Sequence, residues 1–140
     1  MTPIEVFSIA NIIVLPMWIL LVFLPRWKIT RFLIDYKVIP IILSVLYTFY
    51  IVLYTIHYGV INFSSLSSVM TIFTQENALL AGWLHYLAFD LLVGMWIVNQ
   101  NKFLGLNQLL IAPCLFLTFM FGPLGFLLFI VIKAIKNRIR

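Results

Sequence analysis

The chain has 140 residues, of which 64% are hydrophobic and 9% carry a formal charge. Soluble domains contain about 45 to 50% apolar and about 25% charged residues, so this composition excludes an ordinary soluble domain and indicates an integral membrane protein. The formal net charge of +5 comes from short basic clusters beside apolar segments, which is typical of topology signals and contacts with membrane lipids and does not favour nucleic acid as a partner.

Four apolar segments approach the roughly 20 residues that a transmembrane helix needs. The predicted spans cover residues 4–24, 38–58, 78–98 and 109–132. We therefore expect a single transmembrane domain over residues 1–140, folded as an all-α bundle of four helices. No lysine or arginine precedes the first span, so we expect no cleaved secretory signal or transit peptide.

The first span contains Asn11 and Pro16. Proline removes a backbone donor and bends a helix, and an amide inside an apolar helix is expected to turn toward other helices. Residues 25–37 follow, with four basic side chains against one acid, Asp35, and with Trp27 as an interfacial anchor. We predict a short cytoplasmic loop there.

The second span is rich in aromatic and hydroxylated residues. A hydroxylated face recurs at spacings of three and four and consists of Ser44, Thr48, Ile51, Thr55 and Tyr58. This spacing places the side chains on one side of a helix, which we expect to look into the bundle. Residues 59–77 contain no basic side chain and predict a loop and a short amphipathic helix on the side opposite residues 25–37.

The third span places two ionisable residues, His85 and Asp90, inside an apolar run from Ala78 to Val98. Inserting a charged side chain at this depth of a bilayer costs on the order of 3 kcal/mol. A residue that costly is typical of a functional site, so we treat both residues as candidates. A separation of five residues rotates the two side chains by roughly 140°, so we expect them to face different neighbours. General acid and base catalysis is one role for them, and hydrogen bonding that only holds helices together is the other.

Several other residues are candidates for a site around the third span. Trp83 lies seven residues before Asp90, which places both on one helical row. Small residues on the fourth segment allow close approach of a backbone or a flat ligand, and aromatic-lined clefts suit polyenes. The expected substrate-binding residues are Asn11, Thr48, Tyr54, Trp83, Thr118 and Gly122.

The sequence offers little for a metal or a prosthetic group. A single cysteine, Cys114, excludes a disulfide within the chain and a thiolate cluster. His57 lies about 7 Å shallower than His85, and nothing else favours haem between them. We expect no metal and no cofactor.

The fourth segment is interrupted at Gly122 and Pro123, which predict a kink or a break. With four full spans, five basic residues fall on the side of residues 25–37 and four on the other, so the positive-inside rule barely decides the orientation. A re-entrant hairpin would instead place all nine basic residues on one side. Because non-helical backbone at membrane depth must be buried in protein, and 24 apolar residues suit one kinked helix, we predict four full spans.

Two stretches carry a resemblance to a known family. They run from Trp83 to Ile97 (WLHYLAFDLLVGMWI) and from Pro113 to Gly125, and the segment Asn11 to Pro16 adds to the pattern. Over nearly its whole length the sequence resembles the abscisic-acid-deficient-four-like family, which includes the plant neoxanthin synthase-related proteins. The resemblance implies a small multi-span membrane protein, linked in plants to the conversion of violaxanthin to neoxanthin.

That conversion opens an epoxide and removes a proton from a polyene to leave an allene, so it calls for an acid and a base in a dry pocket. Asp90 and His85 have the right chemistry and are the candidate catalytic residues of a carotenoid isomerase-like enzyme. The expected absence of a transit peptide points to a bacterial-type relative, in an inner or thylakoid-type membrane, whose ligand is a carotenoid or another isoprenoid. The alternatives are a non-catalytic pigment- or lipid-binding scaffold, which serves a carotenoid enzyme or a second copy of the chain, and a small proton-coupled transporter.

Overall fold

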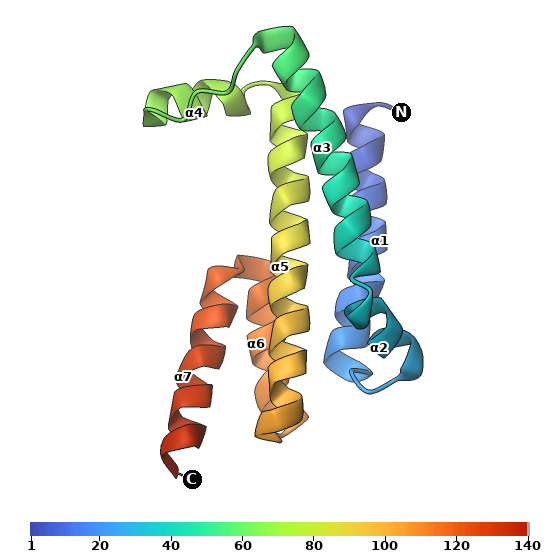
Figure 1. The fold of residues 1–140 in the computed structure, drawn as a ribbon, viewed down its shortest axis with the longest axis vertical. Helices are drawn as coiled ribbons and strands as arrows, with labels where there is room; N and C mark the ends of the chain where they lie inside the picture. Colours follow the sequence, from blue (N-terminus) through green and yellow to red (C-terminus); the bar gives the residue numbers. More distant parts are fainter. Residues whose placement is uncertain (140) are drawn as a thin grey trace.

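The computed structural model describes residues 1–139 and folds that part of the chain into helices and connecting loops, without a strand. The helices are α1 (Pro3–Phe23), α2 (Lys28–Asp35), α3 (Val38–Tyr58), α4 (Leu66–Phe73), α5 (Glu76–Leu104), α6 (Gln108–Phe121) and α7 (Pro123–Ile139). The longest of them, α5, packs against α1, α3 and α6 and forms the axis of the molecule (Figure 1). The all-α prediction is confirmed.

Three stretches of the described chain are long and apolar enough to cross a membrane: α1, the stretch Lys28–Tyr58 that includes α2 and α3, and α5. At about 1.5 Å per residue, the 21 residues of α1 extend roughly 30 Å, which is the thickness of the hydrocarbon core of a bilayer. Helices α1, α3 and α5 coincide with the predicted spans 4–24, 38–58 and 78–98, and α5 is longer at both ends.

The prediction of a fourth full span over residues 109–132 is not confirmed. That segment is divided between α6 and α7, which pack against each other and run in opposite directions (Figure 1). The chain reverses beside the middle of α5, so the C-terminus returns to the end of the bundle where α6 starts. The 14 residues of α6 reach only about 21 Å, less than the hydrocarbon core.

Gly122 and its neighbours explain why the chain turns back instead of continuing. Gly122 has φ of 46°, a left-handed conformation that side chains disfavour, and Pro123 begins α7 where a missing N–H costs nothing. A Cβ atom on Gly125 would overlap the backbone nitrogen of Thr118, so the two helices meet backbone to backbone. Gly122 is buried, so protein covers the non-helical backbone.

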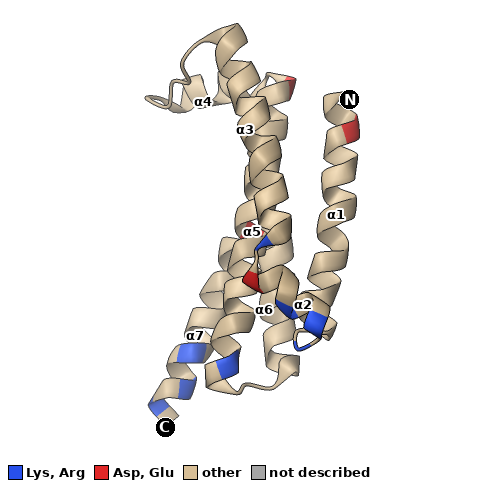
Figure 2. Ribbon diagram, turned by 45° about the vertical axis from the view of Figure 1, so that its right-hand side comes forward, with Lys and Arg blue, Asp and Glu red and all other residues tan. Residues whose placement is uncertain are grey.

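Charged side chains are distributed unevenly along the bundle. Lysine and arginine positions extend from its middle to the end that holds the C-terminus, whereas the end that holds the N-terminus has acidic positions (Figure 2). Because α7 runs back along α6, its basic residues lie at the same end as those of α2. A membrane around α1, α3 and α5 would therefore have one basic face, which is the arrangement that the positive-inside rule favours.

Two local predictions are wrong. Residues 25–37, predicted as a loop, contain the helix α2, one face of which is buried against the bundle. The hydroxylated side of the second span does not look into the bundle, because Ser44, Thr48 and Thr55 are exposed. Each of these hydroxyls donates to the backbone carbonyl four residues earlier, at 2.8 Å, so none needs a partner on another helix.

Helix α5 also continues past its predicted end and stops only at Leu104. The helix persists through polar residues because their side chains find partners on neighbouring helices. Arg31 of α2 donates to Asn99 at 2.9 Å, and Lys133 of α7 donates to Gln100 at 2.7 Å. Polar contacts therefore hold α2, α5 and α7 together at the basic end.

Candidate functional site

Asp90 lies at the midpoint of α5, beside the turn between α6 and α7. Its carboxylate packs against Gly122, where an added Cβ atom would lie 2.5 Å from Oδ1. Only 9% of Asp90 is exposed, and Oδ2 has no hydrogen-bond partner within the described residues. A buried carboxyl oxygen without a partner is costly, which makes this group a candidate for contact with a bound molecule.

Tyr86 lies one helical turn before Asp90, and sequence reasoning did not single it out. Its hydroxyl donates to the backbone carbonyl of Met120 at 2.9 Å. That carbonyl belongs to the last turn of α6, where no helical N–H is available to it, so Tyr86 satisfies an open helix end. Its position four residues before Asp90 places both side chains on one side of a helix, and this spacing could have indicated Tyr86 from the sequence. It did not distinguish Tyr86, because the chain contains many aromatic residues at similar spacings.

Trp83 continues this side of α5 by one further turn and joins it to α1. Its Nε1 atom donates to Oδ1 of Asn11 at 3.1 Å, and its ring stacks on that of Tyr86 with centroids 5.5 Å apart. The ring of Phe7 lies on α1 with its centroid 5.4 Å from that of Trp83. Of the predicted substrate-binding residues, Trp83 thus lies on the row that leads to Asp90, and Asn11 of α1 is hydrogen-bonded to it.

An apolar groove of about 530 Å³ opens beside this row, between α1, α4 and α5. This is the α1–α5 groove, and its walls include Phe7, Phe73, Trp83 and Tyr86. A second cavity of about 240 Å³ shares Trp83 and Tyr86 and extends to Asn11 and to the end of α6. Apolar, aromatic-lined clefts of this size are typical of binding sites for small apolar molecules.

The polar groups of the site lie along one edge of these cavities. Tyr86 lines both cavities, whereas Asp90 lines neither and lies one helical turn behind it. An apolar molecule in the groove would therefore meet Trp83 and Tyr86, and one that extends into the second cavity would also meet Asn11. The carboxyl group of Asp90 is the next polar group beyond them.

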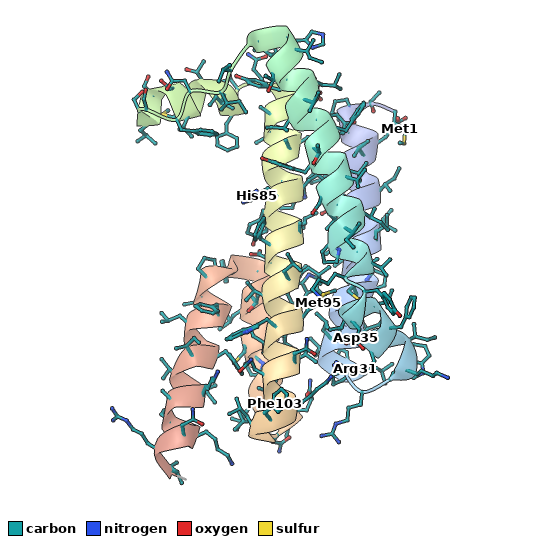
Figure 3. All side chains as sticks on the ribbon, viewed as in Figure 1. Met1, Arg31, Asp35, His85, Met95 and Phe103 are labelled. Carbon is teal, nitrogen blue, oxygen red and sulfur yellow. The ribbon has the colours of Figure 1, made fainter. Side chains whose placement is uncertain are left out.

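His85 lies on a different side of α5 from Asp90. Its ring stacks on Phe89 with centroids 4.7 Å apart, and it faces Tyr47 of α3 at 5.7 Å. The side chain is exposed and points away from α1 (Figure 3). The structure therefore does not bring the two candidate catalytic residues together, as their rotation of roughly 140° along a helix requires.

The remaining candidate residues are divided between the turn and other parts of the bundle. Thr48 is exposed on α3, and Tyr54 is buried against α4 and α5. Thr118 is buried in α6, where it packs against Gly125 of α7. Gly122 is the member of this group that contacts the carboxylate on α5.

Potential metal ligands are not gathered in the described part of the chain: no group of three His, Cys, Asp or Glu side chains is close enough to hold an ion. His57 lies near the end of α3, and its Nδ1 atom is 2.8 Å from the carbonyl oxygen of Leu53. Cys114 is buried in α6 as a free thiol.

Comparison with known proteins places the chain in a family. A family model described as ABA DEFICIENT 4-like matches residues 5–129. The chain belongs to that family. Protein ABA DEFICIENT 4, chloroplastic, from Arabidopsis thaliana is 32% identical over 143 residues, which cover 95% of this chain and 62% of the relative. The chain thus spans less than two thirds of that relative's length, and no solved structure gives a significant match.

The ABA DEFICIENT 4-like match contains the whole candidate site. Asn11, Trp83, Tyr86, Asp90 and Gly122 all lie within residues 5–129, and the match ends inside α7. The family resemblance inferred from the sequence motifs is confirmed. The geometry of the site and the family match therefore concern the same part of the chain.

Proposed function

We propose that this protein is an integral membrane protein of carotenoid or related isoprenoid metabolism, and that it isomerises an epoxide-bearing polyene bound in the α1–α5 groove. Membership of the ABA DEFICIENT 4-like family supports the substrate class, because the sequence resembles plant neoxanthin synthase-related proteins. Three membrane-length apolar stretches of the described chain support the location. The chloroplastic relative favours a thylakoid-type membrane, and no observation favours a bacterial inner membrane.

In the proposed arrangement, α1, α3 and α5 span the bilayer, and the α6–α7 hairpin enters from the basic face and returns to it. Residues 25–37 and the C-terminal part of α7 then share the face that the positive-inside rule assigns to the cytoplasm or the stroma. Asp90 lies at the midpoint of α5 and so at half depth in the membrane. A polyene can enter the groove directly from the surrounding lipid.

The proposal rests on the row Trp83, Tyr86 and Asp90 of α5, in which Trp83 and Tyr86 line an apolar groove and Asp90 lies one helical turn behind Tyr86. An elongated hydrocarbon gains from burial in such a groove, and the few polar groups along one edge orient its oxygen-bearing end ring. A carboxyl group in a dry surrounding is also well suited to proton transfer. Together these features favour acid and base catalysis at one end of a bound polyene.

In the proposed reaction, Asp90 supplies a proton that the hydroxyl of Tyr86 passes to the epoxide oxygen. The epoxide C–O bond breaks, and the neighbouring chain carbon loses its proton, whose electron pair forms the second double bond of the allene. That proton returns to Asp90, so atoms and charge balance and the reaction is an isomerisation. One carboxyl group serves both steps, because His85 lies on another side of α5.

The substitution Asp90→Asn tests this function, because the amide keeps the shape of the side chain and cannot transfer the proton. In a carotenoid-producing host we expect conversion to fall by about 10²-fold or more at equal protein level, measured from the pigment profile. His85→Gln is the matched control on the same helix and should retain conversion. Normal conversion by a well-accumulated D90N variant would contradict the proposal.

A non-catalytic pigment-binding scaffold is the second candidate, and the position of Asp90 behind both cavities favours it. In that case Asp90 only packs against the turn at Gly122. D90N would then lower the amount of folded protein, and the purified wild-type protein would bind a polyene without converting it.

A further inference from the structure

A polar cleft of about 760 Å³ lies at the basic end of the bundle, between the α1–α2 corner and the α5–α6 corner. Arg26, Trp27 and Arg31 line it from the first corner, and Lys102 and Gln108 line it from the second. These two groups are far apart in the sequence, so the fold brings their charges together. This basic cleft lies apart from the α1–α5 groove and shares none of its lining residues.

The charges of the basic cleft are not balanced. Arg26, Arg31 and Lys102 line it, and no acidic residue does. The charge of Arg31 is partly neutralised by Asp35, to which it donates at 3.3 Å, and Arg31 also donates to the neutral amide of Asn99 at 2.9 Å. Within residues 1–139, Arg26 and Lys102 have neither a hydrogen bond nor an ion pair. Two cations that face one cleft without partners favour the binding of an anion between them.

The neutral walls of the cleft are already satisfied by the protein itself. Gln108 donates to the carbonyl of Val22 at 2.7 Å, and Asn101 exchanges hydrogen bonds of 2.9 and 3.1 Å with the backbone of Leu106. These amides therefore fix the two corners and leave the cationic side chains for a ligand. The first turn of α6 also faces the cleft and adds partial positive charge.

An apolar groove of about 590 Å³ between α1 and α6 adjoins the basic cleft, and Phe23 lines both. Trp18, Pro113 and Phe116 form part of its apolar wall. A molecule that occupies the cleft and this α1–α6 groove together needs an anionic head and a hydrocarbon chain. That combination is the chemistry of a charged lipid and not of a free phosphate ion.

We infer that the basic cleft binds the phosphate head group of an anionic membrane lipid, with one acyl chain along the α1–α6 groove. Basic pockets between membrane helices on the positively charged face are suited to such head groups. The bound phosphate bridges Arg26 and Lys102, and so joins the α1–α2 corner to the α5–α6 corner. The lipid thereby stabilises the position of the α6–α7 hairpin against α1.

Thermal unfolding of the purified full chain in neutral detergent tests this binding. Dioleoylphosphatidylglycerol should raise Tm, and dioleoylphosphatidylcholine at the same concentration should raise it less. The double variant R26Q/K102Q should lose about tenfold or more in apparent affinity for phosphatidylglycerol. The control K136Q/R138Q removes the same charge from the last turns of α7, outside the cleft, and should keep the wild-type affinity.

Four results would overturn the inference. Equal stabilisation by the two lipids would show that the protein does not recognise the head-group charge. An equal loss of affinity in the two double variants would show only diffuse attraction to a charged surface. Inorganic phosphate that stabilises as well as phosphatidylglycerol would assign the cleft to a soluble anion. Native mass spectrometry of the wild-type protein needs no variant: preferential retention of phosphatidylglycerol supports the site, and equal retention of phosphatidylcholine contradicts it.

Discussion

The two halves of α5 have different surroundings. The first half, from Glu76 to Asp90, borders the apolar α1–α5 groove and leaves an unpartnered carboxyl oxygen at its inner end. The second half, which ends at Leu104, packs against α6 and α7, and its polar side chains pair with Arg31 and Lys133. The first half borders an apolar groove, whereas the second half is joined to neighbouring helices by polar contacts and borders the basic cleft.

The contrast shows that the α6–α7 hairpin decides where a site can lie. Helix α6 stops at Phe121, beside the middle of α5, and Tyr86 caps its last turn. If α6 continued in its own direction, it would run into the cavity lined by Tyr86 and Met120 and then into the α1–α5 groove. The reversal at Gly122 therefore leaves the groove open and packs against Asp90, one helical turn behind Tyr86 of the groove wall.

The substitution Gly125→Ala should have the largest effect, because it prevents closure of the hairpin. The new Cβ atom would overlap the backbone nitrogen of Thr118, which cannot move aside unless α6 and α7 separate. We expect a loss of about 3 kcal/mol in the free energy of unfolding, measured by denaturation in detergent, together with low accumulation.

Gly105→Ala is the control for this substitution. Nothing lies within 4 Å of a Cβ atom at Gly105, so only its left-handed backbone should cost about 1 kcal/mol. In a single helix over residues 109–132, Gly125 and Thr118 would be about 10 Å apart and alanine would be tolerated. A fully stable G125A variant would therefore contradict the hairpin.

The substitution Tyr86→Phe acts at the boundary between the two halves and should have an intermediate effect. The carbonyl of Met120 loses a donor at 2.9 Å, so the free energy of unfolding should fall by about 1 kcal/mol. Polyene conversion should fall further, by about 10²-fold, because the proposed proton path loses its hydroxyl. Tyr58→Phe, at the exposed end of α3, is the control for both measurements. Equal conversion by Y86F and wild type would exclude Tyr86 from proton transfer.

The substitution Leu79→Trp changes only the open half and should have the smallest effect. Leu79 lines the α1–α5 groove and is 54% exposed, so an indole ring should fill the groove without entering the core. We expect conversion to fall by about tenfold with an unchanged Tm. Leu124→Trp makes the same change on α7, outside the groove, and should leave conversion unaffected. A normal pigment profile with L79W would place the ligand elsewhere.

Hydrophobic length and helical period were enough to predict several features. Helices α1, α3 and α5 coincide with predicted apolar spans, because a membrane-length helix is recognised from its own residues alone. The spacing of five residues predicted that His85 and Asp90 face different neighbours, because helix geometry determines this rotation. The row from Trp83 to Asp90 was predicted on the same basis.

Other features depended on contacts that no local pattern contains. The residues at Gly122 and Pro123 marked an interruption, but the contact between Gly125 and Thr118 decides that the chain reverses. Thr48 was expected to face the bundle, yet its hydroxyl donates to a carbonyl of its own helix and the side chain stays exposed. A hydroxyl that is already hydrogen-bonded within its own helix does not need a partner on another helix, so its side chain does not have to face the bundle.

The sequence alone predicted a helical chain with membrane-length apolar segments, and it predicted that Asp90 is the acidic residue farthest from the ends of such a segment. Both predictions depend only on hydrophobicity and helical period. Only the tertiary structure revealed the reversal at Gly122 and the contact of Tyr86 with the end of α6. It also revealed that Arg26 and Lys102 line the same cleft. Each of these depends on how helices pack, and packing joins residues that the sequence keeps apart.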